Sequence, residues 1–269
     1  MVFSIKFFSF LILLVILVKF GSLALERRLL YHSDSTRVSP SEVGLRNVYE
    51  KEITAADGTK ILTWWANAQP KKYTLLYFHG NGGSLSSRSE RIQDFMGKGY
   101  GIVMMTYRGY SGTDGTPSEK SNISDARIVF NSLREAGIPE NQIILYGESL
   151  GTGIALQIAA EKNIAGLILD APYTSMVDLA ELHYPQLPSR LLMRDRYENL
   201  KFAKKISVPL LVVHGEADEV VPVEMGNEIA SAVKGPSKIL TFPGAGHSDH
   251  YQFGSFNKII EWLQNLSYF

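Results

Sequence analysis

A serine flanked by glycines is the place in this sequence where residue types and spacing first indicate covalent chemistry. Gly147-Glu148-Ser149-Leu150-Gly151 fits the pattern G-x-S-x-G, between an apolar strand-like run and a helix-like run. A sharp strand-to-helix turn strains the backbone of the serine and exposes its hydroxyl, and side chains at the two glycine positions would collide with neighbouring backbone. We therefore expect Ser149 to be a nucleophile. The alternative is a glycine-rich helix start that packs closely on a strand, which Gly151 and Gly153 would serve equally well.

A serine hydroxyl needs a base to take its proton, and the sequence offers six histidines for that role. His247 is the best placed, because it follows the last predicted strand in the loop Gly244 to His250 and can project over the edge of a sheet. We interpret His250 as a surface residue or as the start of the final helix. The alternatives for this loop are a polar loop without catalytic role and a metal site built from its two imidazoles and a carboxylate. We expect His247 to be the general base, and we expect no metal.

In folds that place a nucleophilic serine on a strand-to-helix turn, the carboxylate that orients the histidine comes between the serine and the histidine in chain order. Asp218 fits that order, in a loop that follows an apolar strand and leads into a helix. Asp170, which ends the preceding strand, and Glu216 are rival acids, each of which could instead cap an element or be a solvated loop charge. We expect Asp218 to orient the imidazole of His247.

Acyl transfer also needs hydrogen-bond donors for the oxygen that becomes negatively charged. One donor should be the backbone N–H of Leu150, the residue after the nucleophile, and the other should come from the loop after the strand that ends near Phe78. The glycines of the stretch His79 to Ser84 let this backbone approach a substrate closely. We nominate the N–H of Asn81 and interpret His79 as a structural residue at the strand end.

The elements that must position these residues alternate along the chain. After an antiparallel hairpin of strands Asn47–Thr54 and Ile61–Ala68, the strand-like runs are too apolar for a sheet with one solvated face. They are Thr74–Gly80, Gly101–Tyr107, Gln142–Gly147, Ile164–Asp170, Pro209–Gly215 and Ser237–Phe242. Helices are predicted at Ser86–Lys98, Ser121–Ala136, Leu150–Lys162, Val223–Val233 and Phe253–Leu266. This alternation predicts an α/β protein with a doubly wound, mostly parallel sheet and antiparallel N-terminal strands.

One long irregular insert interrupts the pattern between Tyr173 and Val208. It is too short for a large cap domain, and we expect it to shape the substrate pocket, with Leu191-Leu192-Met193 and Tyr197 as contributors.

The composition narrows the function further. With 269 residues, 45% of them hydrophobic, the chain can bury one large core in a single catalytic domain. The net charge of +0 gives no electrostatic footprint for nucleic acid. Because there is no cysteine, a thiol nucleophile, a thiolate zinc site and an iron–sulfur cluster are all excluded. We expect no cofactor, and the oligomeric state stays open.

The N-terminal segment is predicted to lie outside the catalytic domain. An unbroken apolar run from Phe7 to Val18 is followed by Lys19 and a second apolar stretch, and together they approach the ~20 residues that cross a bilayer. We predict a single-pass transmembrane helix and a membrane-associated protein, with basic residues that mildly favour a cytoplasmic catalytic domain. The alternatives are a signal peptide cleaved after Ser22-Leu23-Ala24, which implies export, and a buried core helix. The predicted division is an anchor or signal at 1–28, a linker at 29–46 and the catalytic domain at 47–269.

Five ordered motifs together resemble the α/β-hydrolase domain-containing group of membrane-associated serine hydrolases, which includes protein-depalmitoylating members and bacterial relatives with an N-terminal hydrophobic segment. The motifs lie at Tyr77–Asn81, Tyr107–Glu119, Leu145–Gly151, His214–Asp218 and Gly244–His247, and the resemblance covers Val48 to Leu266. It implies the α/β-hydrolase fold without a large cap domain. It also implies a triad of Ser149, Asp218 and His247, an oxyanion hole of Asn81 and Leu150, and a structural role with some pocket lining for the second motif.

We therefore expect a serine hydrolase that cleaves an ester or thioester of a small-molecule or acylated substrate through an acyl-enzyme. A serine peptidase or aminopeptidase of the same fold is an alternative, because a triad does not distinguish ester from amide. A membrane-tethered binding protein without catalytic activity is a further one.

Overall fold

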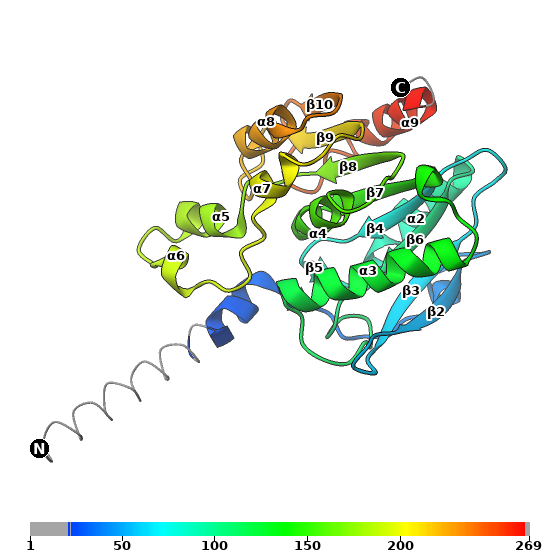
Figure 1. The fold of residues 1–269 in the computed structure, drawn as a ribbon, viewed down its shortest axis with the longest axis horizontal. Coiled ribbons are helices and arrows are strands. Elements are labelled where there is room, and N and C mark those ends of the chain that lie inside the picture. Colours follow the sequence, from blue (N-terminus) through cyan, green and yellow to red (C-terminus); the bar gives the residue numbers. More distant parts are fainter. Residues whose placement is uncertain (1–20, 22, 267–269) are drawn as a thin grey trace, which may run out of the picture.

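A computed structural model describes residue 21 and residues 23–266. Within them one mixed sheet contains β2 (Tyr49–Thr54), β3 (Lys60–Ala66), β4 (Thr74–Phe78), β6 (Gly101–Met105), β7 (Ile143–Glu148), β8 (Gly166–Asp170), β9 (Leu210–Gly215) and β10 (Ser237–Phe242). The strand order is β10-β9-β8-β7-β4-β6-β3-β2 (Figure 1). The strands from β4 onward pair in parallel, whereas β3 is antiparallel to both β2 and β6. The predicted strands and the predicted fold class are thus confirmed.

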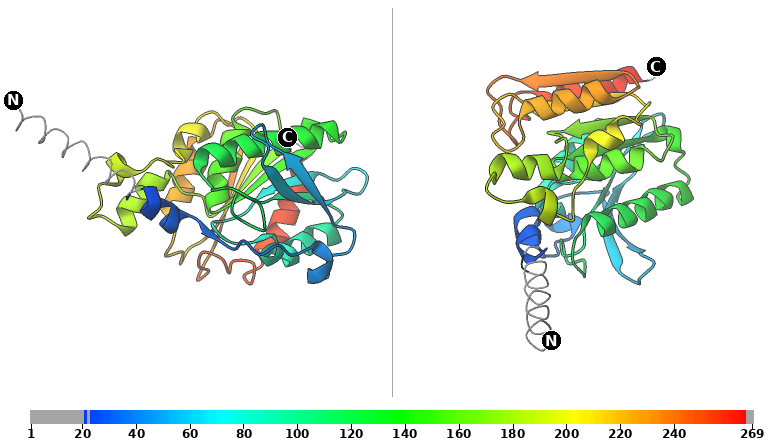
Figure 2. Two further views of the ribbon diagram at one scale, coloured as in Figure 1. Left: turned by 90° about the horizontal axis from the view of Figure 1, so that it is seen from below. Right: turned by 60° about the vertical axis from the view of Figure 1, so that its left-hand side comes forward.

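Helices cover both faces of this sheet (Figures 1 and 2). The helices α3 (Glu119–Glu135), α4 (Leu150–Ala159) and α8 (Val223–Ala232) pack on one face, and α2 (Ser89–Gly97) and α9 (Ser255–Asn265) pack on the other. Successive side chains of a strand point to opposite faces of the sheet. Leu76 and Phe78 of β4 therefore pack in the core beneath α3, α4 and α8, whereas Leu75 and Tyr77 pack in the core beneath α2 and α9. Both faces are buried, which explains why the strand sequences are almost continuously apolar.

The insert between β8 and β9 forms three short helices, α5 (Met176–His183), α6 (Ser189–Leu192) and α7 (Asn199–Ala203). In Figure 1, α5 and α6 lie at the same end of the molecule as the helical residues 23–30. A short parallel bridge joins β1 (His32–Ser33) to β5 (Gly82–Gly83) in the loop after β4. The insert is therefore an elaboration of the loop at one end of the sheet.

The membrane prediction needs a correction. No helix among the described residues is long and apolar enough to cross a membrane. On this finding the predicted transmembrane helix, and with it the single-pass membrane localisation, is wrong. The described helical residues 23–30 carry Glu26, Arg27 and Arg28 among their leucines, and a stretch with these charges is too polar to cross a bilayer. Most of the predicted span, and the predicted cleavage site in part, fall on residues 1–20 and 22, outside the described residues.

Candidate active site

The nucleophile position is a strained turn between β7 and α4. Ser149 has φ 48° and ψ −113°, a conformation that side-chain-bearing residues rarely adopt. The flanking glycines make it possible: a Cβ at Gly147 would lie 2.6 Å from the carbonyl oxygen of Gly151, and one at Gly151 would collide with the carbonyl of Phe78. The backbone N–H of Ser149 donates to the carbonyl of Asp170 at 2.8 Å. Packing against the neighbouring strands therefore holds the strain.

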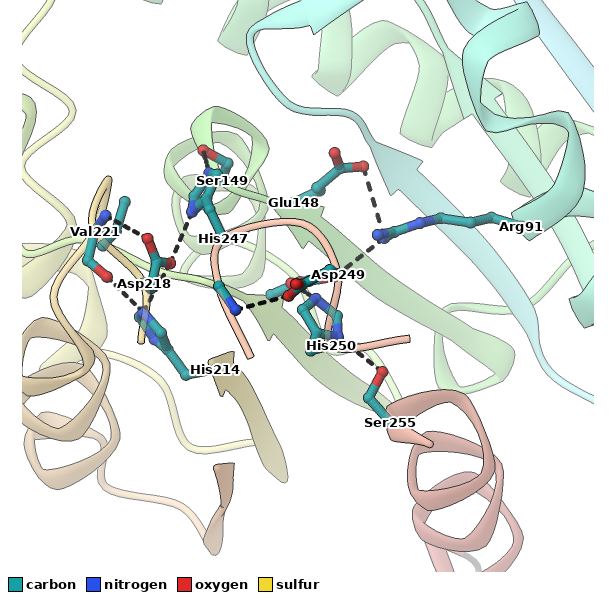
Figure 3. Close-up of polar contacts among 12 residues, drawn as sticks. Arg91, Glu148, Ser149, His214, Asp218, Val221, His247, Asp249, His250 and Ser255 are labelled. Atoms are coloured by element: carbon teal, nitrogen blue, oxygen red, sulfur yellow. Dashed lines mark hydrogen bonds and ion pairs between the residues drawn. The ribbon is translucent and has the colours of Figure 1, made fainter. Parts of the chain in front are cut away.

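The three residues predicted from spacing meet at this turn (Figure 3). His247 Nε2 lies 3.0 Å from Ser149 Oγ, and His247 Nδ1 lies 2.7 Å from Asp218 Oδ2. Their chain positions are far apart, and the carboxyl ends of β7 and β9 and the loop after β10 bring them together. Glu216, a rival acid, instead accepts a hydrogen bond from Thr241 Oγ1 at 2.7 Å.

The carboxylate of Asp218 is buried but well supplied with donors. Its Oδ1 accepts the backbone N–H groups of Val220 and Val221, each at 2.8 Å. Its Oδ2 also lies 3.4 Å from His214 Nε2, which is itself 2.8 Å from the carbonyl of Val221. Burial raises the pKa of Asp218, and the hydrogen bonds from His214 and His247 outweigh it, so the net pKa is lowered. The group stays ionised beside the imidazole; sequence reasoning missed the supporting role of His214.

The pKa of the His247 imidazole shifts in the opposite direction to that of Asp218. Burial lowers its pKa, but the hydrogen bond and the negative charge of Asp218 outweigh that effect, so the pKa is raised above its ordinary value of 6.5. A carboxylate on Nδ1 also fixes the proton on that nitrogen and leaves Nε2 free to accept one from a hydroxyl. This arrangement can deprotonate Ser149.

Asn81 and Leu150, the residues predicted to supply the oxyanion donors, line the same cavity as Ser149. Leu150 is the first residue of α4, whose N–H has no intrahelical acceptor. The loop that carries Asn81 is tightly held, because the Asn81 carbonyl accepts both the N–H of His32 at 3.0 Å and the hydroxyl of Tyr110 at 2.7 Å. Tyr107 donates to the carbonyl of His79 at 2.6 Å. The motif from Tyr107 onward therefore supports the loop, which is the structural part of its predicted role, whereas none of the described residues that line the cavity belongs to the motif.

Comparisons with known proteins show the family to which the chain belongs. A model of the alpha/beta hydrolase fold family matches residues 73–204, and a serine hydrolase (FSH1) model matches residues 172–248. Human alpha/beta hydrolase domain-containing protein 17B is 31% identical over 205 residues, which cover 74% of this chain and 69% of that protein. The Xenopus tropicalis protein of the same name is 32% identical over the same shares. The chain belongs to the α/β-hydrolase family. It is a serine hydrolase.

Other similar proteins extend the comparison. An uncharacterized protein of Mycobacterium tuberculosis is 30% identical over 227 residues, 83% of this chain and 81% of that one. Among solved structures, an esterase of Pyrococcus furiosus matches with a TM-score of 0.69 and 21% identity over 87% of this chain and 98% of that chain. An esterase of Exiguobacterium antarcticum matches with a TM-score of 0.65 and 20% identity over 80% and 100%. At these identities the two esterases are similar in fold.

In this hydrolase Arg88, whose side chain is 12% exposed, connects the loop after β4 to the turn between β7 and α4. Arg88 donates to the carbonyl of Gly82 at 2.6 Å and to Glu148 Oε1 at 2.9 Å, and Tyr77 donates to Glu148 Oε2 at 2.6 Å. Burial raises the pKa of Glu148, but the charges of Arg91 and Arg88 outweigh it and bring that pKa to about 2. The carboxylate next to Ser149 is thus a fixed anion that holds two backbone segments in register. Local sequence patterns contain no signal for this contact.

A second histidine–aspartate pair is formed by His250 and Asp170. His250 Nε2 is 2.8 Å from Asp170 Oδ1, and His250 Nδ1 is 2.7 Å from Ser255 Oγ (Figure 3). Arg91 and Tyr146 also donate to Asp170, at 3.1 and 2.8 Å. The interpretation of His250 as a surface residue is wrong, because its side chain is buried. The rival acid Asp170 has its own partner.

The Ser149–His247 contact opens into a cavity of about 490 Å³, within the ~300–1,000 Å³ of typical small-molecule sites. The polar residues of its lining are His32, Asn81, Ser149 and His247, together with Glu26, His183, Ser189 and Glu219. The rest of the lining is mainly apolar and comes from three segments: Leu25, Leu29 and Leu30; Met176, Leu179, Ala180 and Tyr184; and Leu187, Leu192 and Met193. Of the insert residues predicted to shape the pocket, Leu192 and Met193 do so, whereas Leu191 is 82% exposed and Tyr197 is buried in the core.

Proposed function

We propose that this serine hydrolase cleaves an ester or thioester whose acyl group is a medium or long hydrocarbon chain. One observation carries the proposal: His247 bridges Ser149 Oγ and the Asp218 carboxylate at the lining of a mainly apolar cavity. A base, an oriented serine and an apolar channel are the parts that acyl transfer from a hydrocarbon chain requires.

The proposed reaction proceeds in two halves. Ser149 Oγ attacks the carbonyl carbon while His247 Nε2 takes its proton, and Asp218 holds the Nδ1–H and stabilises the imidazolium. The carbonyl oxygen becomes an oxyanion and accepts the N–H groups of Leu150 and Asn81. Collapse of this intermediate breaks the bond to the alcohol or thiol, which leaves with the proton from His247. Water then attacks the acyl-enzyme by the same route and releases the acid and the free serine.

The lining favours an acyl chain over a peptide. Hydrocarbon that enters this cavity gains about 25 cal/mol for each Å² of apolar surface removed from water. Peptide N–H and C=O groups in the same place would lose their hydrogen bonds to water and find leucine and methionine side chains instead, at a cost of roughly 1–3 kcal/mol for each unpaired group.

The test is hydrolysis of p-nitrophenyl esters and acyl-CoA thioesters, from acetyl to palmitoyl, by the full chain. Ser149→Ala, His247→Ala and Asp218→Asn should each lower kcat by about 10⁴-fold or more. Ser248→Ala, a change in the same loop outside the bridged triad, should stay within about twofold and serves as the matched control. A Ser149→Ala protein as active as the parent would exclude the nucleophile assignment. A parent that prefers acetyl over every longer ester would exclude the acyl-chain assignment alone.

A further inference from the structure

One wall of the cavity comes from outside the predicted catalytic domain. Leu25, Leu29 and Leu30, all in the helical residues 23–30, line the cavity together with residues of α5 and α6. Leu30 continues into the main core, Leu29 is half-buried, and Leu25 is 48% exposed. The helix therefore extends from the core to the outer part of the cavity.

This wall is fastened to the insert by buried polar contacts. Glu26, 7% exposed, accepts with Oε1 the N–H groups of Arg194 and Asp195, at 2.9 and 2.8 Å. Tyr31 donates its hydroxyl to Asp195 Oδ2 at 2.8 Å. These contacts fix the position of the described helical residues against the insert. Glu26 thus joins the helix to the segment just after α6, next to Leu192 and Met193, which line the cavity.

The chain then runs from the wall directly to the oxyanion loop. His32 and Ser33 pair in parallel with Gly82 and Gly83, and the N–H of His32 donates to the carbonyl of Asn81. A single short segment therefore touches both the acyl cavity and the loop nominated to hold the oxyanion. Substitutions in the two parts of this segment should have separable effects, on chain-length preference in the helix and on turnover in β1.

We propose that the helix of residues 23–30 sets the acyl-chain preference of the enzyme, with Leu29 as a specificity-determining residue and Glu26 as a positioning residue that closes the wall. The inference rests on the proposed function, since it assigns part of the same cavity. It places a determinant of specificity in a segment that the sequence division assigned to the anchor and linker.

The first experiment changes the volume of the wall. Leu29→Trp should lower kcat/KM for the parent's best long-chain ester by about tenfold or more, mainly through KM, and change the acetyl ester by less than about twofold. Leu29→Ala should move the preference toward longer chains. Arg28→Ala, on the exposed side of the same helix, is the matched control and should leave the profile unchanged. An identical chain-length profile in the parent and both Leu29 variants would overturn the inference.

The second experiment removes the hydrogen bonds between Glu26 and the backbone amides of Arg194 and Asp195. Glu26→Ala should speed hydrogen exchange at the amides of Arg194 and Asp195 and flatten the chain-length profile. Glu26→Gln keeps an acceptor oxygen for both amides and should restore the profile to within about twofold. Faster exchange with an unchanged profile would show that Glu26 has only a structural role and would overturn its assignment here.

A binding assay separates failure of this inference from failure of the proposed function. A dansyl-labelled fatty acid is titrated into the Ser149→Ala protein with and without Leu29→Trp, so the readout needs no turnover. We expect weaker binding with Leu29→Trp by about tenfold. Unchanged binding overturns the wall assignment even if esters are hydrolysed. Weakened binding in a protein that hydrolyses no ester supports the wall and refutes the proposed reaction.

Discussion

Two histidine–aspartate pairs stand side by side in this molecule, and only one is open to a ligand. His247 connects Ser149 to Asp218, and three positions later His250 connects Ser255 to Asp170 with equally short contacts. The side chain of His247 is 20% exposed and borders the cavity. The side chains of His250 and Asp170 are each 1% exposed.

A catalytic triad requires more than its three residue types, because the serine must also lie where a substrate can reach it. Ser149 lies on a strained turn beside the free N–H of a helix start, whereas Ser255 is the first residue of α9 inside the core. Arg91 also donates to Asp170, so the second pair belongs to an ion network that joins α2, β8 and the histidine loop. We infer that the first pair does chemistry and that the second holds the loop carrying His247 in place.

The largest expected effect is on kcat, which should distinguish Asp218 from Asp170. Asp218→Asn should lower kcat by about 10⁴-fold, because the amide favours the wrong tautomer of His247. Asp170→Asn should retain far more activity, since the Asp170 side chain forms a hydrogen bond with neither Ser149 nor His247. The hydrogen bond from the Ser149 N–H to the backbone carbonyl of residue 170 survives the substitution. Steady-state kinetics at saturating ester measures both. Equal losses in kcat for two folded variants would contradict the division of roles.

The next effect separates the pairs by stability. Asp170→Asn leaves Arg91 and His250 without their buried anion and should lower the free energy of unfolding by about 3 kcal/mol at pH 7. Burial raises the pKa of Asp170, but His250 and Arg91 outweigh it, so the folded-state pKa is below 3.8. The carboxylate therefore stabilises the fold above its unfolded pKa, and that stabilisation is lost as the pH falls through the folded-state value.

Urea denaturation at pH 7 and at pH 3, below the unfolded-state pKa, measures this effect. Glu161→Gln, which breaks the exposed pair with Arg127, is the matched control and should cost less than about 1 kcal/mol. A loss for Asp170→Asn no larger than that of the control would show that the buried network is unimportant for stability.

The pH dependence assigns the catalytic proton to one histidine. Because Asp218 raises the pKa of His247, the imidazole loses its proton only above its ordinary value of 6.5. We expect kcat/KM to rise with pH along a limb with its midpoint above pH 6.5. The limb should persist in His250→Gln and belong to His247 alone. If the limb disappeared in His250→Gln, the titration would belong to His250 and the assignment to His247 would be wrong.

The smallest effect concerns the two serines. Ser255→Ala removes one hydrogen bond to His250 and should cost about 1 kcal/mol of stability. It should leave labelling by a fluorophosphonate probe unchanged, whereas Ser149→Ala should abolish it. Gel fluorescence of the two variants beside the parent measures this. Labelling that survives in Ser149→Ala and is lost in Ser255→Ala would reverse the comparison.

The sheet could be predicted from the sequence because local patterns determine it. The run Ser237–Phe242 is β10 to the residue, and the other strands differ by a few positions at their ends. Likewise Ser149, Asp218 and His247 were found because each follows a strand in the order that the fold requires. Their meeting at 2.7 and 3.0 Å follows from the parallel strands, whose carboxyl ends share one edge.

Contacts between distant segments could not be predicted. Nothing near Arg88 indicates that it reaches Glu148, and nothing near Glu26 indicates that it reaches the amides of Arg194 and Asp195. The burial of His250 depends on Asp170, which is far away in the chain. Periodicity describes which face of an element is apolar, and it carries no information on which polar group lies across from it.

The neighbours of β7 determine when the strained turn can form during folding. β7 lies between β4 and β8, and the close approach of Gly151 to the carbonyl of Phe78 requires β4 to be in register already. That pairing joins segments with a whole β-α unit between them, and such non-local contacts form slowly because long loops must close first. A newly made chain therefore becomes catalytically competent only after its central strands have assembled, and refolding measured by the return of activity should lag behind the return of helical signal.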